Sequence, residues 1–372
     1  MTLTHTSKIK VRPASGSLRI AGVILVLALS RPASAMCTPS FSYADGWLGA
    51  DFALSIPSDP AHSIWLFADS FVGPASQKTR ANVPMVSNTV GISTCRNNEW
   101  SIHYFHRKDP VSGAAQPIFD SATSKFRYWP LDGIIYRGRL YEFLIEIEVT
   151  GKGAFDFREI GATLAEVINP RDEPDRWNIR YHHLSSETGL AVGASAIVED
   201  HYVYLFSIAD RIAPGKHQIL LARLPLEHLD SPAANLEHLS MQGNWKPGLN
   251  LPDSKVLVDE GAPDFSVRFH PAISKWLMVQ TDSAFPAHTI GIRVADHLEG
   301  RWSSFTPLYN IPEMNPAAPS SSIFCYAAKE HIEFAPSPNS TLITYACNSL
   351  SFSHLASDMT LYYPIAVELP LQ

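Results

Sequence analysis

The chain has 372 residues, a hydrophobic fraction of 45% and a formal net charge of −7. That length is enough for one large core or for two domains. The acidic balance argues against nucleic acid and anionic membrane surfaces as partners, and it suits a neutral ligand.

The first residues have the layout of a secretory signal peptide. A basic region is followed by an apolar run over residues 20–29 and by Ala33-Ser-Ala35, a small-residue cleavage site. The apolar run is too short to span a bilayer. We therefore expect cleavage near Ala35 and a soluble protein that is secreted or periplasmic, with no attachment to a membrane.

The chain contains four cysteines, Cys37, Cys95, Cys325 and Cys347. An even number in an exported protein suggests disulfides. Cys325 and Cys347 fall in two successive predicted strands, which is compatible with a cross-strand bridge, and Cys37 with Cys95 would then fix the N-terminus. Other pairings stay open, and zinc is the weaker alternative because no Cys-x-x-Cys or His cluster accompanies them.

Beyond the signal peptide, helical periodicity is nearly absent, and short apolar strands recur between Gly, Pro, Asn and Asp residues. Each unit has a first strand, a turn and a very apolar second strand. The second strands are expected near residues 65–70, 140–147, 202–208, 275–281 and 342–348. Four of the units end in a tryptophan: Trp100, Trp177, Trp245 and Trp302.

Five such units predict an all-β fold, a five-bladed β-propeller of four-stranded antiparallel blades. It would form a single domain over residues 36–372, after a signal peptide over residues 1–35, and we expect a monomer. The blades are expected at about 45–105, 125–180, 188–246, 260–305 and 320–372. The rival architectures are a long β-sandwich, which leaves the recurring Trp unexplained, and a parallel β-helix, which needs a shorter repeat.

The first unit carries an aspartate in each of two apolar predicted strands, Asp51 in residues 49–57 and Asp69 in residues 63–73. A carboxylate in such a strand is unfavourable unless it has a hydrogen-bond or ionic partner or serves a function. Neighbouring strands can turn two carboxylates toward one cavity, as acid/base chemistry requires. The structural alternative is that both are turn residues at strand ends.

Aligning the units separates repeated positions from unique ones. The first-strand position is occupied by Asp51, Asp132, Ser195, Ser266 and Lys329 or Glu330, and the end of the second strand by Asp69, Glu146, Ser207, Gln280 and Asn348. The acids concentrate in the first two blades, with Glu330 beside them around the ring. Crowded carboxylates raise one another's pKa, which leaves one protonated acid and one ionised base. That is the equipment for cleaving a glycosidic bond.

Other side chains near the expected channel mouth are candidates for substrate binding. Those that could hydrogen-bond sugar hydroxyls are Arg80, Asn88, Ser195, Arg268 and His331, and those that could stack on a sugar are Trp129, Trp47, Phe71 and Phe285. The structural alternatives are core positions for the aromatic residues, pairing with acids for the arginines, and an interior position for His331.

The first unit resembles a known family. Gly49-Ala-Asp51 followed by Trp65-Leu-Phe-Ala-Asp69-Ser-Phe-Val-Gly73 is similar to the Gly-Gly-Asp and Phe-Gly-Asp-Thr-Phe-x-Gly pair of an uncharacterised class of bacterial propeller domains. Some members of that class are endo-D-arabinanases. Met85-Val-Ser-Asn88-Thr-Val-Gly-Ile matches the next strand of the class, where a Ser-Asn pair follows an Arg.

More distantly, the chain resembles the five-bladed arabinanases, xylosidases and levansucrases. The resemblance implies that Asp51 is the base or nucleophile and Asp69 the second essential acid, with Glu146, Asp132 and Glu330 competing to donate the proton. The chain departs from the class where alanines replace two glycines, at Ala50 and Ala68, and in the Cys325–His331 segment.

Three hypotheses follow. The first is an exported glycoside hydrolase that acts on a furanoside or related polysaccharide, and the second is a propeller that binds carbohydrate without catalysis. The third is a cation site in which Asp51, Asp69 and Asp132 hold a structural calcium ion, and this is compatible with either of the others. We expect no required cofactor, and the chain contains neither a dinucleotide-binding nor a nucleophile-elbow motif.

Overall fold

Antiparallel strands make up most of the structure, a computed structural model that describes residues 37–121, 126–151, 155–210, 217–315 and 322–371. The expected signal peptide lies outside the described residues. The first sheet contains β2 (Leu54–Asp59), β3 (His62–Phe67), β6 (Thr89–Arg96) and β7 (Glu99–Phe105). The second contains β10 (Arg127–Tyr136), β11 (Arg139–Val149), β12 (Phe157–Val167) and β13 (Ile179–Ser185).

Three further sheets follow in chain order. The third contains β14 (Leu190–Glu199), β15 (Tyr202–Ala209), β16 (His217–Pro225), β17 (Glu237–Leu239) and β18 (Trp245–Pro247), with β19 (Val258–Gly261) beside β16. The fourth contains β20 (Phe265–His270), β21 (Lys275–Thr281), β22 (Thr289–Ala295) and β23 (Thr306–Asn310). The last contains β24 (Ile323–Glu330), β25 (Ser340–Ser349) and β26 (Ile365–Pro370). This last sheet has three strands in the described part of the chain, where four were expected.

Shorter elements connect these sheets. Two small sheets contain β1 (Trp47–Ala50), β4 (Ser70–Val72) and β5 (Met85–Val86), and β8 (Arg107–Lys108) and β9 (Ala115–Gln116). The α-helices are α1 (Pro232–Asn235) and α2 (Phe352–Ser357), and the 3-10 turns are η1 (Pro174–Arg176), η2 (Leu226–His228), η3 (Leu251–Asp253), η4 (Pro312–Met314) and η5 (Ile332–Phe334). No helix among the described residues is long and apolar enough to cross a membrane.

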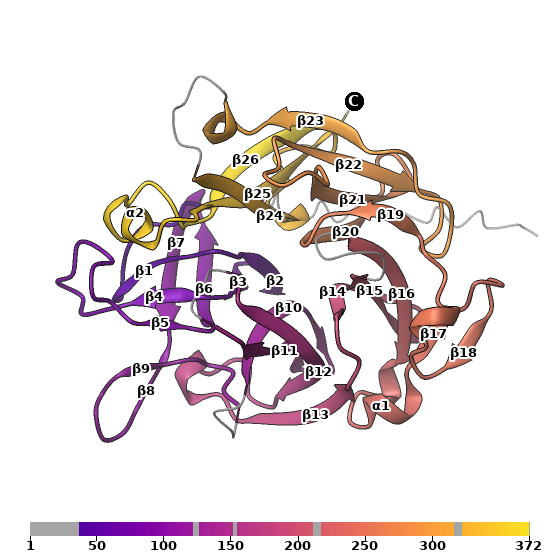
Figure 1. Cartoon of the computed structure of the whole chain (residues 1–372), viewed down its shortest axis with the longest axis horizontal. Coiled ribbons are helices and arrows are strands. Elements are labelled where there is room, and N and C mark those ends of the chain that lie inside the picture. The colour runs from indigo at the N-terminus through magenta and orange to yellow at the C-terminus, as the bar shows by residue number, and fades with distance from the viewer. Residues whose placement is uncertain (1–36, 122–125, 152–154, 211–216, 316–321, 372) are drawn as a thin grey trace, which may run out of the picture. The chain divides into compact units, whose positions relative to one another are not determined.

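The first strand of each large sheet lies toward a common centre, and the later strands lie outward (Figure 1). Strand β2 contacts β10, β10 contacts β14, β14 contacts β20, and β20 contacts β24. The hydroxyl of Ser55 on β2 meets His331, just after β24, at 2.7 Å and so links the last sheet to the first. The all-β prediction is confirmed, and the arrangement is that of a β-propeller, in which neighbouring sheets bury each other's apolar faces.

Three of the inner strands, β14, β20 and β24, are also tied to the strand before them by one polar side chain. The backbone N–H of one strand donates to a side-chain oxygen of the strand before it, in the pairs Ala196 to Asp132 (2.8 Å), Val267 to Ser195 (3.0 Å) and Glu330 to Ser266 (2.7 Å). These three acceptors are therefore equivalent positions of a repeated structural device. Asp51 does not belong to the series, because it precedes β2, whereas Asp132 lies within β10.

Two disulfides join the cysteines in the pairing that we expected. Cys325 and Cys347 lie directly opposite each other on β24 and β25, with their Cα atoms 4.0 Å apart. Cys37 is joined to Cys95 on β6, which fixes the start of the described chain to the first sheet.

Removing the disulfides should reduce stability according to the loops that they close. The separations are 58 residues for Cys37–Cys95 and 22 residues for Cys325–Cys347. Double serine substitutions should lower the free energy of unfolding by about 4 kcal/mol for the first pair and about 3 kcal/mol for the second, because longer freed loops gain more entropy. Denaturant unfolding under oxidising conditions would measure this, and unchanged midpoints would contradict it.

Candidate active site

Asp51 and Asp69 lie where two neighbouring segments leave the first sheet and enter a smaller one. The predicted strands are both interrupted at their aspartates, Asp51 between β1 and β2 and Asp69 between β3 and β4. Strands β1 and β4 pair antiparallel with Ala50 opposite Ser70, so the next residue on each side, Asp51 or Asp69, faces the other. The register of β1 and β4 therefore places the two aspartates opposite each other. Both lie just outside these strands.

The Asp51 carboxyl is held by a tyrosine on the last sheet. The hydroxyl of Tyr326 on β24 donates to Asp51 Oδ2 at 3.0 Å, and the amide of Asn348 donates to the Tyr326 oxygen at 3.1 Å. Asp51 Oδ1 is buried and has no hydrogen-bond partner. Burial and the nearby Asp69 charge raise the pKa of Asp51 well above its ordinary value. Asp51 therefore holds a proton more tightly than an ordinary aspartate does.

The Asp69 carboxyl has a different environment. Burial raises the pKa of Asp69 to about 6, although a hydrogen bond from Trp129 and the charge of Arg127 act in the opposite direction. The indole N–H of Trp129 donates to Asp69 Oδ1 at 2.9 Å. Asp69 is therefore mainly ionised at neutral pH. The stacking of Trp129 on a sugar stays a prediction.

The backbone beside Asp51 is shaped by a tight approach to a distant loop. Gly49 has a φ of +117°, and a Cβ atom there would lie 2.0 Å from the carbonyl oxygen of Tyr362. Only glycine fits this position. Burial and the charge of the nearby Asp51 raise the pKa of Tyr362. Gly49 of the Gly-Ala-Asp motif thus has a steric role.

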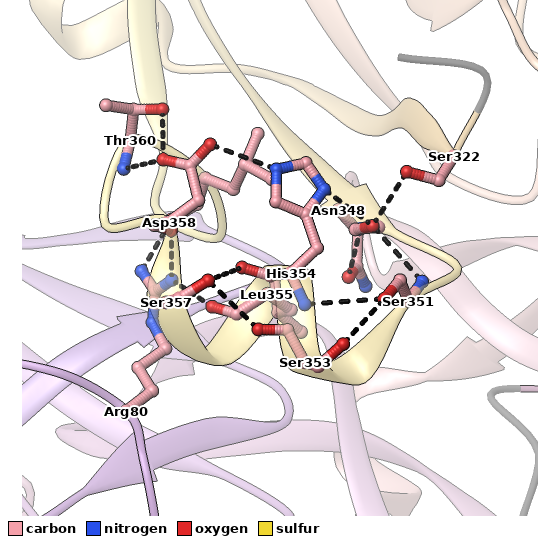
Figure 2. A network of polar contacts seen from close by, with 12 residues as sticks. Arg80, Ser322, Asn348, Ser351, Ser353, His354, Leu355, Ser357, Asp358 and Thr360 are labelled. Atoms are coloured by element: carbon pink, nitrogen blue, oxygen red, sulfur yellow. Dashed lines mark hydrogen bonds and ion pairs between the residues drawn. The ribbon is translucent and has the colours of Figure 1, made fainter.

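Arg80 holds that distant loop in place and is not available to a substrate. The side chain is fully buried, and all five of its N–H groups are used. Their acceptors are the carbonyl oxygens of Leu48, Leu355, Asp358 and Leu361 and the hydroxyl of Tyr43. Figure 2 shows the guanidinium beside the end of α2, near Leu355 and Asp358. The expected substrate-binding role is corrected to a structural one.

Asn88 is corrected for the same reason. Its amide nitrogen donates to the carbonyl oxygens of Phe119 and Tyr128, and its amide oxygen accepts from the backbone N–H of Phe119. The side chain is completely buried. It joins the start of β6 to the second sheet, and a buried amide with these partners has little left to offer a sugar.

Asp132, Ser195 and Arg268 form a separate network in the channel interior. Arg268 Nη1 donates to Asp132 Oδ2 at 3.3 Å and to Ser195 Oγ at 3.2 Å, and Ser195 also donates to Asp132. The second Asp132 oxygen accepts from the Gly133 backbone at 2.8 Å. Asp132 therefore has a cationic partner and several donors, and the network joins three inner strands.

Glu330 and His331 also have partners inside the protein. Glu330 accepts hydrogen bonds from His270 at 2.6 Å and Thr341 at 2.5 Å. His331 meets Ser55 at 2.7 Å and Thr344 at 2.8 Å, and burial lowers the pKa of His331 well below its ordinary value. His331 is therefore a neutral interior histidine.

Glu146 accepts a hydrogen bond from Thr163 at 2.6 Å on the second sheet. Glu146 lies opposite Tyr128 in the strand register. Trp129, the partner of Asp69, lies opposite Ile145. Because successive side chains on a strand point to opposite faces, Glu146 lies on the face away from Trp129.

The structure adds residues that the sequence did not single out. Tyr326 donates a hydrogen bond to Asp51. Asp264 lies just before β20, and its charge contributes to the raised pKa of Asp51, after burial and the Asp69 charge. Burial raises the pKa of Asp264, although Lys329 opposes this. The sequence signal that could have identified Asp264 is its position, because it precedes an inner strand as Asp51 does. Further around the centre, burial and the Asp210 charge raise the pKa of Glu159 to about 7.

Lys329 fills the interior of the ring. Its ammonium group donates to the carbonyl oxygens of Phe265 at 2.7 Å and Ala194 at 3.1 Å, and it lies 4.8 Å from the centre of the Phe52 ring. The side chain is fully buried. Lys329 therefore joins the inner strands β14 and β20, and the charges of Asp264 and Asp132 act on it.

Within the described ranges, the one group of close metal-ligating atoms is Glu313, Cys325 and Cys347. The two sulfurs form a disulfide and so cannot bind a metal as thiolates. The calcium ion expected at Asp51, Asp69 and Asp132 stays a prediction. To bind the ion, Asp132 would have to give up its ion pair with Arg268.

Two surface cavities lie along the third sheet, one of them at its border with the second sheet. One is lined by residues that include His238, Lys246 and Asp253, and the other by residues that include Tyr136 and Tyr202. Neither Asp51 nor Asp69 is among the residues that line them. The chemistry therefore favours the aspartate pair as the candidate active site.

Comparison with known proteins adds a family and a fold. The family model described as "Domain of unknown function (DUF5005)" matches residues 39–363. No curated protein matches the sequence. A candidate hydrolase from Bacteroides ovatus has a similar fold, with a TM-score of 0.69 and 15% identity over 88% of this chain and 87% of that one.

Two further structures are less similar. A xylan β-1,4-xylosidase from Bacillus halodurans has a TM-score of 0.47 and 10% identity over 82% of this chain and 49% of that one. An α-L-arabinanase from Cellvibrio cellulosa has a TM-score of 0.42 and 11% identity over 87% of this chain and 92% of that one.

Proposed function

The chain belongs to the DUF5005 family, and we propose that it is a glycoside hydrolase that uses Asp51 and Asp69 as its acid and base. The observation that carries the proposal is the opposed pair itself. Two half-buried carboxyls with raised pKa values lie opposite each other, and each has a different donor, Tyr326 or Trp129. Unequal environments that separate two carboxyl pKa values are the arrangement by which acid and base roles are assigned.

In the proposed reaction, protonated Asp51 transfers its proton to the glycosidic oxygen as the bond from that oxygen to the anomeric carbon breaks. The Asp69 carboxylate takes a proton from a water molecule, whose oxygen forms the new bond to the anomeric carbon. One water is consumed, and one sugar hydroxyl and one hemiacetal are formed. The Arg127 charge, which favours an ionised Asp69, supports this assignment over the one implied by the resemblance, in which Asp51 is the base or nucleophile.

The finer expectations belong to the same proposal. The large sheets that begin with β2, β10, β14, β20 and β24 are the five blades of a propeller. The substrate is a neutral furanoside-type or related polysaccharide, which the net charge of −7 suits. Export accounts for the two disulfides, which persist in oxidising compartments.

The pH dependence of activity should follow the ionisation of Asp51 and Asp69. As pH falls below about 6, the Asp69 carboxylate takes up a proton and can no longer act as a base, so kcat/KM should decline toward acid. Activity should decline again in alkali when Asp51 loses its proton. A pH profile of kcat/KM measures both limbs, and a flat profile between pH 5 and 7 would speak against Asp69 as the base.

Reducing-sugar release from arabinan, arabinogalactan, xylan and levan tests the proposed reaction. Cleavage of one polymer by the mature protein supports the hydrolase. Retention of a polymer on an affinity gel without any cleavage would instead support the second hypothesis, a propeller that binds carbohydrate.

A further inference from the structure

Three phenylalanine rings from separate segments meet beside the last inner strand. Phe155 precedes β12, Phe285 precedes β22, and Phe324 lies on β24. The ring centres are 5.7 Å apart for Phe155 and Phe285, 5.8 Å for Phe155 and Phe324, and 5.3 Å for Phe285 and Phe324. We call these three residues the phenylalanine platform.

The platform is unusually open for such a cluster. Phe155 is 54% exposed and Phe285 is 64% exposed, while Phe324 is buried beneath them. Single exposed apolar side chains are ordinary, but two exposed rings from separate segments that meet over a buried third ring indicate a binding surface. Two exposed rings are far too small an area for a stable protein interface.

The platform is continuous with the aspartate pair. Phe324 and Tyr326 stand on the same face of β24, and their rings stack with centres 5.4 Å apart and an angle of 25°. The Tyr326 hydroxyl in turn donates to Asp51. An uninterrupted path of side chains therefore leads from the exposed rings to the candidate proton donor.

We infer that the phenylalanine platform binds a sugar ring of a polysaccharide chain whose next units lie at Asp51 and Asp69. This inference rests on the proposed function for the identity of its ligand. The C–H groups on one side of a sugar ring carry slight positive charge and suit the negative face of an aromatic ring. An apolar surface beside a few hydrogen-bonding groups is typical of ligand sites. The substrate class is thus an extended chain that reaches beyond the cleaved bond.

The test uses Phe285→Ala and Phe155→Ala, with Phe352→Ala as the matched control. Phe352 on α2 is 63% exposed, nearly the same as Phe285, but contacts Phe71 instead of the platform. All three side chains are mostly in solvent, so each variant should keep the melting temperature of the wild type. Affinity for arabinan, arabinogalactan, xylan and levan is measured by gel retardation in an Asp69→Asn background, which blocks cleavage, and KM and kcat are measured in the active background.

We expect Phe285→Ala and Phe155→Ala to weaken retention of one polymer about 10-fold and to raise KM by a similar factor, with kcat nearly unchanged. Phe352→Ala should change neither. If the wild type cleaves a polymer and the platform variants bind and cleave it equally well, the inference is wrong and the hydrolase stands. If the wild type retains a polymer but cleaves none, and the platform variants lose retention, the hydrolase is wrong and the platform stands. If the wild type retains none of the four polymers, the platform inference is overturned.

Discussion

Asp51→Asn should lower kcat by about 100- to 10,000-fold while the protein stays folded, and Asp69→Asn should do the same. Asparagine keeps an oxygen that can accept the hydrogen bond from Tyr326 or Trp129, so the local packing is retained. It removes the proton donor in one variant and the base in the other. Reducing-sugar release from the cleaved polymer, measured with circular dichroism on the same samples, gives both quantities.

The Asp69→Asn variant should lose activity but gain stability at pH 8. Because the pKa of Asp69 is raised to about 6, its carboxyl binds a proton more tightly in the folded chain than in the unfolded one. Its contribution to stability is therefore present at low pH and is lost as pH rises from about 4 through 6. At pH 8 the ionised carboxylate opposes folding, and Asp69→Asn should raise the melting temperature above that of the wild type.

Asp132→Asn serves as the matched control. Asp132 pairs with Arg268, so its loss should lower the melting temperature and leave kcat of the folded fraction within a few-fold of the wild type. Two outcomes would contradict the acid/base assignment. One is full activity in Asp51→Asn, and the other is a fall in the melting temperature of both pair variants at pH 8, which would make their carboxylates structural.

Arg80→Ala should lower the free energy of unfolding by at least about 4 kcal/mol. The substitution leaves four buried carbonyl oxygens without their donor, at Leu48, Leu355, Asp358 and Leu361. Each unsatisfied buried group costs about 1 to 3 kcal/mol. Urea unfolding followed by tryptophan fluorescence measures the loss.

Arg80→Lys and Arg171→Ala complete this experiment. Lysine offers three donors at one point and cannot reproduce the guanidinium fork, so Arg80→Lys should lose most of the same stability. Arg171 is exposed, and Arg171→Ala should change stability by less than about 0.5 kcal/mol. A stable Arg80→Lys protein with a raised KM would mean that Arg80 does bind substrate after all.

Strand positions and disulfide pairing could be predicted from the sequence because their causes are local. The second strands expected near residues 140–147 and 202–208 are present as β11 and β15, since a run of apolar and β-branched residues bounded by turns has few other stable conformations. Cys325 and Cys347 fall on successive strands of one hairpin, so their pairing follows from the strands. The two aspartates of the first unit also attract attention without a structure, because carboxylates among apolar residues need an explanation.

The tertiary structure alone decided which polar residues have partners and which face one another. Arg80 and Asn88 look like ligand-binding residues in sequence, but their acceptors come from segments such as Leu355–Leu361 and Phe119 that no local pattern connects to them. Asp132 looks equivalent to Asp51, but it lies within its strand and has Arg268 as a partner, whereas Asp51 lies before its strand and faces Asp69. The phenylalanine platform likewise joins residues that are far apart in the chain. Sequence determines each residue's chemistry and local conformation, but the distance between residues on different sheets depends on how the whole ring packs.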